Sequence, residues 1–73
     1  MSVTVYTKPS CVQCDATKRH LDKLGIKYDT VDITVDVDAF DMLVEKGFKA
    51  APVVIAGDEA WAGYQPDKID GLV

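Results

Sequence analysis

The residues best suited to chemistry are two cysteines, Cys11 and Cys14, which are separated by two residues. They follow an alternating apolar stretch and open a helical pattern, so we expect a strand to lead to them and a helix to begin at them. A thiolate is the nucleophilic form of cysteine, and the free N–H groups and partial positive charge of a helix N-terminus favour it. Residues three apart share a helix face. We therefore predict a reversible disulfide, with Cys11 as the attacking thiol and Cys14 as the resolving thiol.

Two structural interpretations of this pair are weaker. A bridge between Cys11 and Cys14 closes a ring too small to restrict the unfolded chain much. A structural zinc site needs about four ligands, and His20 is the only histidine in the chain. On a helix, His20 would lie roughly 13 Å along the axis from Cys11, out of reach as a ligand or base. We therefore expect no metal site, and we interpret His20 as a surface or half-buried helix residue.

The composition excludes several classes of protein. A chain of 73 residues makes one small domain, covering residues 1–73. The net charge of −4 comes without a basic stripe, so we expect no nucleic-acid partner. The chain opens directly on strand-like residues, and we expect no signal peptide and no membrane-spanning run. We therefore predict a cytoplasmic protein, and disulfides in that compartment are usually catalytic.

Hydrophobic periodicity predicts an α/β domain with the element order β-α-β-α-β-β-α. The predicted strands cover residues 2–7, 26–33, 53–56 and 59–62. The predicted helices cover residues 12–24, the segment between a cap at Thr34 or Asp36 and a stop at Gly47, and residues 66–72. The second helix carries an apolar stripe, made of Val37, Phe40, Leu43 and Val44. The third strand is a continuous apolar run, so we expect it to be buried on both faces.

With C-x-x-C between the first strand and the first helix, this order resembles the thioredoxin fold, and in size the chain resembles the glutaredoxins. Three segments together are similar to the NrdH-redoxins, a family of small glutaredoxin-like proteins. These segments are Cys11-Val12-Gln13-Cys14, Ala51-Pro52 and Trp61-Ala62-Gly63-Tyr64-Gln65-Pro66-Asp67. In the last segment, Ala62, Tyr64 and Gln65 stand where family members often carry serine, phenylalanine and arginine.

The resemblance implies a four-stranded mixed sheet flanked by three helices, and a dithiol–disulfide oxidoreductase. NrdH-redoxins are reduced by thioredoxin reductase and supply electrons to the class Ib ribonucleotide reductase, so the reductase and the large subunit of the latter enzyme are the implied partners. NADPH would act only through the flavoprotein reductase, with no cofactor bound to this chain, which we expect to be a monomer. Two alternatives remain open. One is a glutathione-dependent glutaredoxin, and the other is a metal or iron–sulfur carrier in which two chains each lend cysteines.

Seven residues are candidates for contacts with a substrate or partner: Lys8, Val12, Gln13, Ala51, Pro52, Trp61 and Tyr64. Val12 and Gln13 must face solvent or a partner, because the cysteines take the inner positions. Thioredoxin-like proteins place a cis-proline beside the C-x-x-C, which implies a cis Ala51–Pro52 bond and an Ala51 backbone open to an added strand. Trp61 and Tyr64 are either core aromatics or, as the resemblance implies, aromatics with an edge toward a partner. Lys8 either lends positive potential to the thiolate or is an exposed turn residue.

Overall fold

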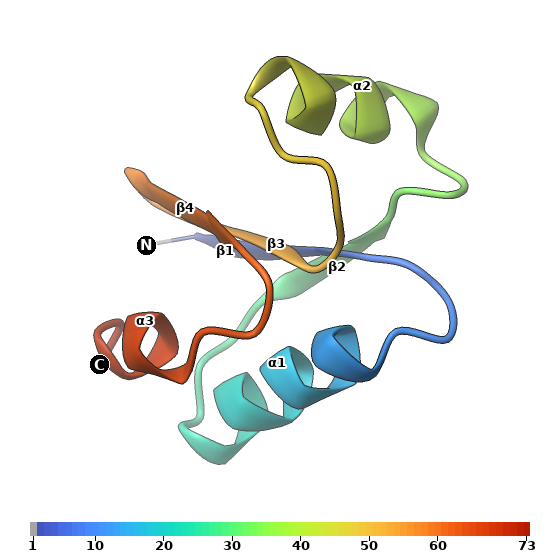
Figure 1. The fold of residues 1–73 in the computed structure, drawn as a ribbon. Coiled ribbons are helices and arrows are strands. Elements are labelled where there is room, and N and C mark those ends of the chain that lie inside the picture. The colour runs from blue at the N-terminus through green and yellow to red at the C-terminus, as the bar shows by residue number, and fades with distance from the viewer. Residues whose placement is uncertain (1) are drawn as a thin grey trace.

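A four-stranded sheet forms the centre of the computed structural model, which describes residues 2–73 (Figure 1). Strands β1 (Val3–Thr7), β2 (Asp29–Asp32), β3 (Val53–Ala56) and β4 (Glu59–Ala62) lie in the order β2-β1-β3-β4. The β1–β2 pair is parallel, whereas the β1–β3 and β3–β4 pairs are antiparallel. This is the mixed sheet of the thioredoxin fold, as predicted.

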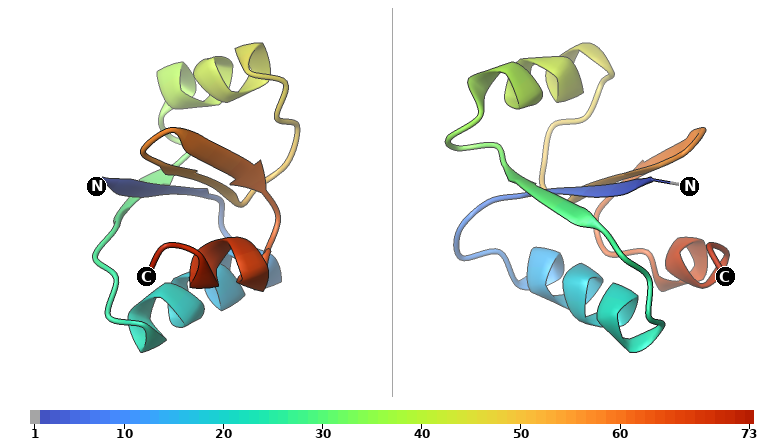
Figure 2. Two further views of the ribbon diagram at one scale, coloured as in Figure 1. Left: turned by 90° about the vertical axis from the view of Figure 1, so that its left-hand side faces the viewer. Right: turned by 180° about the vertical axis from the view of Figure 1, so that it is seen from behind.

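Three helices flank the sheet. Helices α1 (Val12–Lys23) and α3 (Pro66–Asp70) cover one face, and α2 (Val37–Glu45) lies over the other (Figure 2). Of the two predicted caps of α2, Asp36 is the one used, because its Oδ1 accepts a hydrogen bond of 3.0 Å from the backbone N–H of Ala39. The observed order β-α-β-α-β-β-α confirms the prediction.

The second strand is shorter than predicted, since it begins at Asp29 rather than at Ile26. The backbone N–H of Ile26 bonds to the carbonyl of Leu21 at 3.0 Å, across a glycine, Gly25, with a φ of +72°. This hydrogen bond caps the C-terminus of α1, and it uses the Ile26 N–H that a strand would otherwise pair with its neighbour. Ile26 and Tyr28 pack against the core from the connecting segment instead of from a strand.

The main core lies between the sheet and the α1–α3 face. Leu21, Val54 and Ile69 are fully buried there, and the third strand is buried on both faces as predicted, with Val53 and Val54 at 1% and 0% exposure. The opposite face is less complete. Of the predicted apolar stripe on α2, only Leu43 is buried, because the helix lies over a groove instead of packing directly on the sheet.

The turn from β2 into α2 is held by Asp32. Its carboxylate accepts hydrogen bonds from the backbone N–H of Thr34 at 2.8 Å and from the Thr34 hydroxyl at 2.6 Å. Both bonds favour the ionised form and lower the pKa of Asp32 below its ordinary value. Thr34 therefore supports the turn, whereas Asp36 caps the helix.

Replacement of Leu21 by alanine tests the importance of the α1–sheet contact. We expect Leu21→Ala to lower the free energy of unfolding by about 2–5 kcal/mol, because it leaves a cavity in a fully buried site. Urea unfolding followed by circular dichroism measures this loss. The control is Val35→Ala, at a side chain 77% exposed, which should change stability by less than about 0.5 kcal/mol. Equal losses in the two variants would contradict the assignment of Leu21 to the core.

Replacement of Thr34 by valine tests the Asp32 turn. Thr34→Val removes the hydroxyl donor, so the pKa of Asp32 should rise toward its ordinary value, as read from a carboxyl-carbon NMR titration. Because the pKa of Asp32 is lower in the folded state, its ionised form adds stability above the unfolded pKa, and this stability is lost as the pH falls through the folded pKa. The variant should therefore lose less stability on acidification. Thr30→Val, on β2, is the control and should leave the Asp32 titration unchanged.

Candidate functional site

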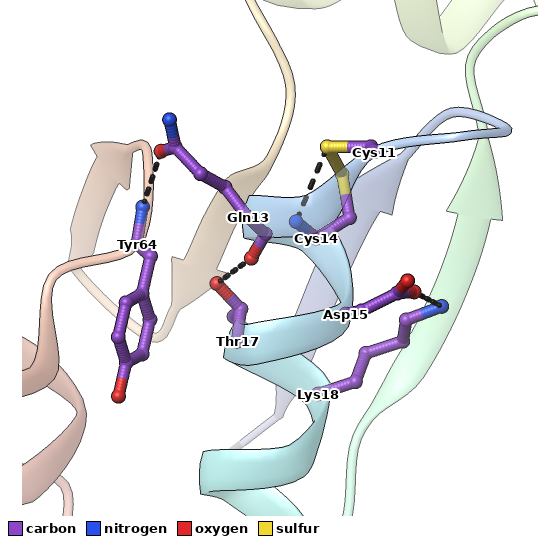
Figure 3. The surroundings of a disulfide bond; sticks show 7 residues. All are labelled: Cys11, Gln13, Cys14, Asp15, Thr17, Lys18 and Tyr64. Atoms are coloured by element: carbon purple, nitrogen blue, oxygen red, sulfur yellow. Dashed lines mark hydrogen bonds and ion pairs between the residues drawn. A yellow bond between two sulfur atoms is a disulfide. The ribbon is translucent and has the colours of Figure 1, made fainter.

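The two cysteines lie where β1 leads into α1, as predicted, and their side chains form a disulfide (Figure 3). Cys11 is the N-cap of α1 and Cys14 lies in its first turn, with 5.2 Å between their Cα atoms. The Cys11 sulfur accepts a hydrogen bond of 3.1 Å from the backbone N–H of Cys14. The connection from β1 to α1 therefore places the Cys11 sulfur at the N-terminus of α1 and the Cys14 sulfur in the first turn of this helix.

The two sulfurs differ in access and in surroundings. Cys11 is 9% exposed, whereas Cys14 is only 1% exposed. An incoming disulfide therefore meets Cys11 first. After reduction, a negative charge on Cys11 would lie at the positive end of α1 and accept the N–H bond from Cys14. This arrangement suits Cys11 to attack and Cys14 to resolution.

The Ala51–Pro52 peptide bond is cis, as predicted. The β1–β3 register pairs Tyr6 with Val53, so Pro52 stands beside the end of β1 that leads to Cys11. The Pro52 carbonyl accepts a hydrogen bond of 2.7 Å from the backbone N–H of Gly63, which ties this loop to the segment after β4. Pairing of a substrate strand with the Ala51 backbone remains a prediction.

Val12 and Gln13 both turn outward, as predicted, and the Val12 side chain is 79% exposed. The Gln13 side chain is nevertheless engaged, because its Oε1 accepts a hydrogen bond of 3.1 Å from the backbone N–H of Tyr64 (Figure 3). The buried Thr17 hydroxyl donates to the Gln13 carbonyl at 2.9 Å. The sequence carries no local signal for the bond to Tyr64, since its partners are 51 positions apart.

The predicted partner-facing edge of Trp61 is wrong. Trp61 is 3% exposed and packs in the main core, because the alternation of β4 turns it toward α1 and α3. Its indole Nε1 is buried, and it has no hydrogen-bond partner within residues 2–73. Pro52 is also buried, with less than 2% exposure, so its ring adds no surface for a partner. Tyr64, at 37% exposure, does reach the surface.

A groove of about 380 Å³ between α2 and the sheet was not predicted from the sequence. Phe40 and Val44, from the stripe on α2, are 47% and 52% exposed along it. Ala51 also lines the groove, which therefore reaches the proline loop. Two lysines, Lys8 and Lys49, are exposed and line this groove. The effect of Lys8 on the thiolate remains a prediction.

Residues 2–73 also bear on the questions of a metal site and of a membrane-spanning helix. Within this part of the chain, no three or more Cys, His, Asp or Glu side chains gather as a metal site would require. None of its helices is both long and apolar enough to cross a membrane.

The chain is similar to known redox proteins over its whole length. The glutaredoxin family profile matches residues 3–61. The glutaredoxin-like protein NrdH of Salmonella typhimurium is 46% identical over 72 residues, which cover 99% of this chain and 89% of that protein. The NrdH-redoxin of Escherichia coli, a glutaredoxin-like protein with a thioredoxin-like activity profile, superposes with a TM-score of 0.98 at 41% identity, covering 100% of this chain and 96% of the other. The thioredoxin-like protein BC3987 superposes with a TM-score of 0.90 at 29% identity, covering 99% and 100%.

Single replacement of each cysteine tests their division of labour. Cys14→Ser should still attack a disulfide substrate and then accumulate as a mixed disulfide, because no resolving thiol is present. Cys11→Ser should form no such adduct, since the remaining thiol is almost fully buried. Non-reducing gels with a protein disulfide substrate show the difference. Adducts trapped by Cys11→Ser, with none in Cys14→Ser, would reverse the assignment.

Proposed function

This chain belongs to the glutaredoxin family, among its NrdH-type members, and is a thiol–disulfide oxidoreductase, and we propose that it carries electrons from thioredoxin reductase to a class Ib ribonucleotide reductase. The proposed site of action is the cytoplasm, and the proposed electron source is NADPH, which acts through the flavoprotein reductase with no cofactor resident in this chain. The proposed working form is a monomer. The large subunit of the ribonucleotide reductase is the proposed acceptor.

The observation that carries this proposal is the apolar surface beside the disulfide. Val12, between the two cysteines, is 79% exposed, and the groove beside the proline loop is lined mainly by apolar side chains. An exposed apolar patch of this kind is typical of a surface that contacts another protein. The thioredoxin-like activity profile of the Escherichia coli NrdH-redoxin supports the same choice of reductase for this chain.

The proposed reaction has two exchange steps. The Cys11 thiolate attacks one sulfur of the target disulfide, a mixed disulfide forms, and the other target sulfur leaves as a thiolate. The Cys14 thiolate then attacks the Cys11 sulfur, which forms the Cys11–Cys14 disulfide and releases the second target thiolate. Two electrons have passed to the target, whose thiolates take up protons from solvent according to their pKa. The reductase returns two electrons to the Cys11–Cys14 disulfide.

The glutathione-dependent alternative requires cationic groups placed for two carboxylates. The candidates near the cysteines are Lys8 and Lys49, at the border of a mostly apolar groove. Of the seven candidate contact residues, Pro52 and Trp61 are buried and add nothing to an apolar contact surface. The proposed surface therefore consists of Val12, Tyr64 and the exposed residues of the groove. This surface suits a protein partner better than a small dianionic peptide.

A coupled assay tests the proposed electron source. We expect thioredoxin reductase with NADPH to turn this protein over rapidly, and glutathione with glutathione reductase to do so poorly. NADPH consumption with a protein disulfide acceptor is measured for each reductase in turn, and Cys11→Ser is the inactive control. Rapid turnover with glutathione alone would replace this proposal with the glutaredoxin alternative. A visible absorption band in freshly purified protein would instead support a cluster carrier.

A further inference from the structure

A series of hydrogen bonds connects the last turns of α1 to the residues between the cysteines. The His20 ring lies 2.8 Å from the Tyr64 hydroxyl through Nδ1 and 2.8 Å from the Asp70 carboxylate through Nε2. The backbone N–H of Tyr64 donates in turn to Gln13 Oε1 at 3.1 Å, beside the disulfide (Figure 3). Helices α1 and α3 and the segment 63–65 are thus joined to the turn that holds the cysteines.

The chemistry of these groups orients His20. An ionised Asp70 carboxylate only accepts hydrogen bonds, so Nε2 of His20 must carry the proton in this contact. In the neutral ring, Nδ1 then accepts from the Tyr64 hydroxyl. A phenylalanine at position 64 would have no hydroxyl for this bond. The contact with Nδ1 therefore depends on the Tyr64 hydroxyl.

The segment 63–65 also holds the proline loop. The Gly63 N–H donates to the Pro52 carbonyl at 2.7 Å, and Gly63 adopts a φ of +81°, a conformation that L side chains rarely take. A Cβ atom at this position would lie 3.3 Å from Gln13 Oε1, so the segment passes close to the C-x-x-C turn. Segment 63–65 therefore contacts both the proline loop and the C-x-x-C turn.

We propose that His20 is a positioning residue, which holds the Tyr64 hydroxyl and thereby keeps segment 63–65 against Gln13 and Pro52. The inference rests on the proposed function in one respect, since it requires a protein partner that contacts segment 63–65 and Gln13. His20 touches neither sulfur, so its loss leaves the attack by Cys11 intact. The loss of His20 instead makes Tyr64 and Gln13 more mobile, and a partner must then order both residues when the partner docks. The expected signature is a raised KM for the partner with an unchanged kcat.

Two substitutions of His20 separate its two contacts. The side-chain amide of asparagine lies near the position of Nδ1, whereas that of glutamine lies near the position of Nε2. His20→Asn should therefore keep the bond to Tyr64, and His20→Gln should keep only the bond to Asp70. We expect His20→Gln to raise the KM of thioredoxin reductase for this protein about fivefold, the value of one net hydrogen bond, with kcat within about twofold. His20→Asn should remain close to the wild type.

The control is Lys23→Ala, which changes an exposed side chain near His20 and should leave KM unchanged. The reaction of the reduced His20→Gln, His20→Asn and Lys23→Ala variants with the small disulfide 5,5′-dithiobis(2-nitrobenzoate) should match the wild type, because it involves no docking. An equal KM in all variants would overturn the proposal. A fall in kcat as large as the fall in kcat/KM, together with a lower Tm, would also overturn it in favour of a purely structural role.

Amide hydrogen exchange separates a failure of this inference from a failure of the proposed function. NMR of the oxidised protein reports the exchange rate of the Tyr64 N–H, with no reductase present. We expect this exchange to be at least about fivefold faster in His20→Gln and in Tyr64→Phe, since the bond to Gln13 is held less firmly. Unchanged exchange in both variants would refute the positioning role of His20, whichever reductase the protein uses.

Discussion

The packing of α1 against the sheet is the contact on which the site depends. Leu21 and Thr17 are fully buried on this helix, and they fix where its N-terminus emerges beside the end of β1. Cys11 caps that N-terminus, so the position of its sulfur follows from the core below it. The same packing buries Cys14 one turn further in. The unequal access of the two sulfurs is thus a consequence of how the helix is seated.

The two faces of the sheet serve different purposes. The face under α1 and α3 is closed by a continuous core, into which Trp61 is also drawn. The face under α2 is only partly closed, and apolar side chains such as Phe40 remain exposed along a groove that reaches Ala51. A small domain thereby combines a core that holds the cysteines in place with an apolar surface next to them. This division fits the electron-carrier function proposed above.

The site is completed by segments that are distant in the sequence. The Gly63 and Tyr64 amides bond to Pro52 and to Gln13, so one short segment braces both the proline loop and the C-x-x-C turn. His20 extends this bracing to α3 through Asp70. The surface beside the disulfide is therefore held by hydrogen bonds between loops, and the helices support it from the core side.

Local sequence patterns predicted the element order, the place of Cys11 and Cys14 at the start of α1 and the Asp36 cap as one of two candidates. These features depend on periodicity and on residues close together in the chain. The family resemblance further predicted the cis Ala51–Pro52 bond that the structure contains. Tertiary packing, by contrast, sets which face of each element is covered. It buried Trp61 and Pro52, left most of the α2 stripe exposed, and brought Gln13 to Tyr64 and His20 to Asp70. Contacts between residues about 50 positions apart leave no periodic pattern in a single sequence, since they arise from the way in which separate elements pack.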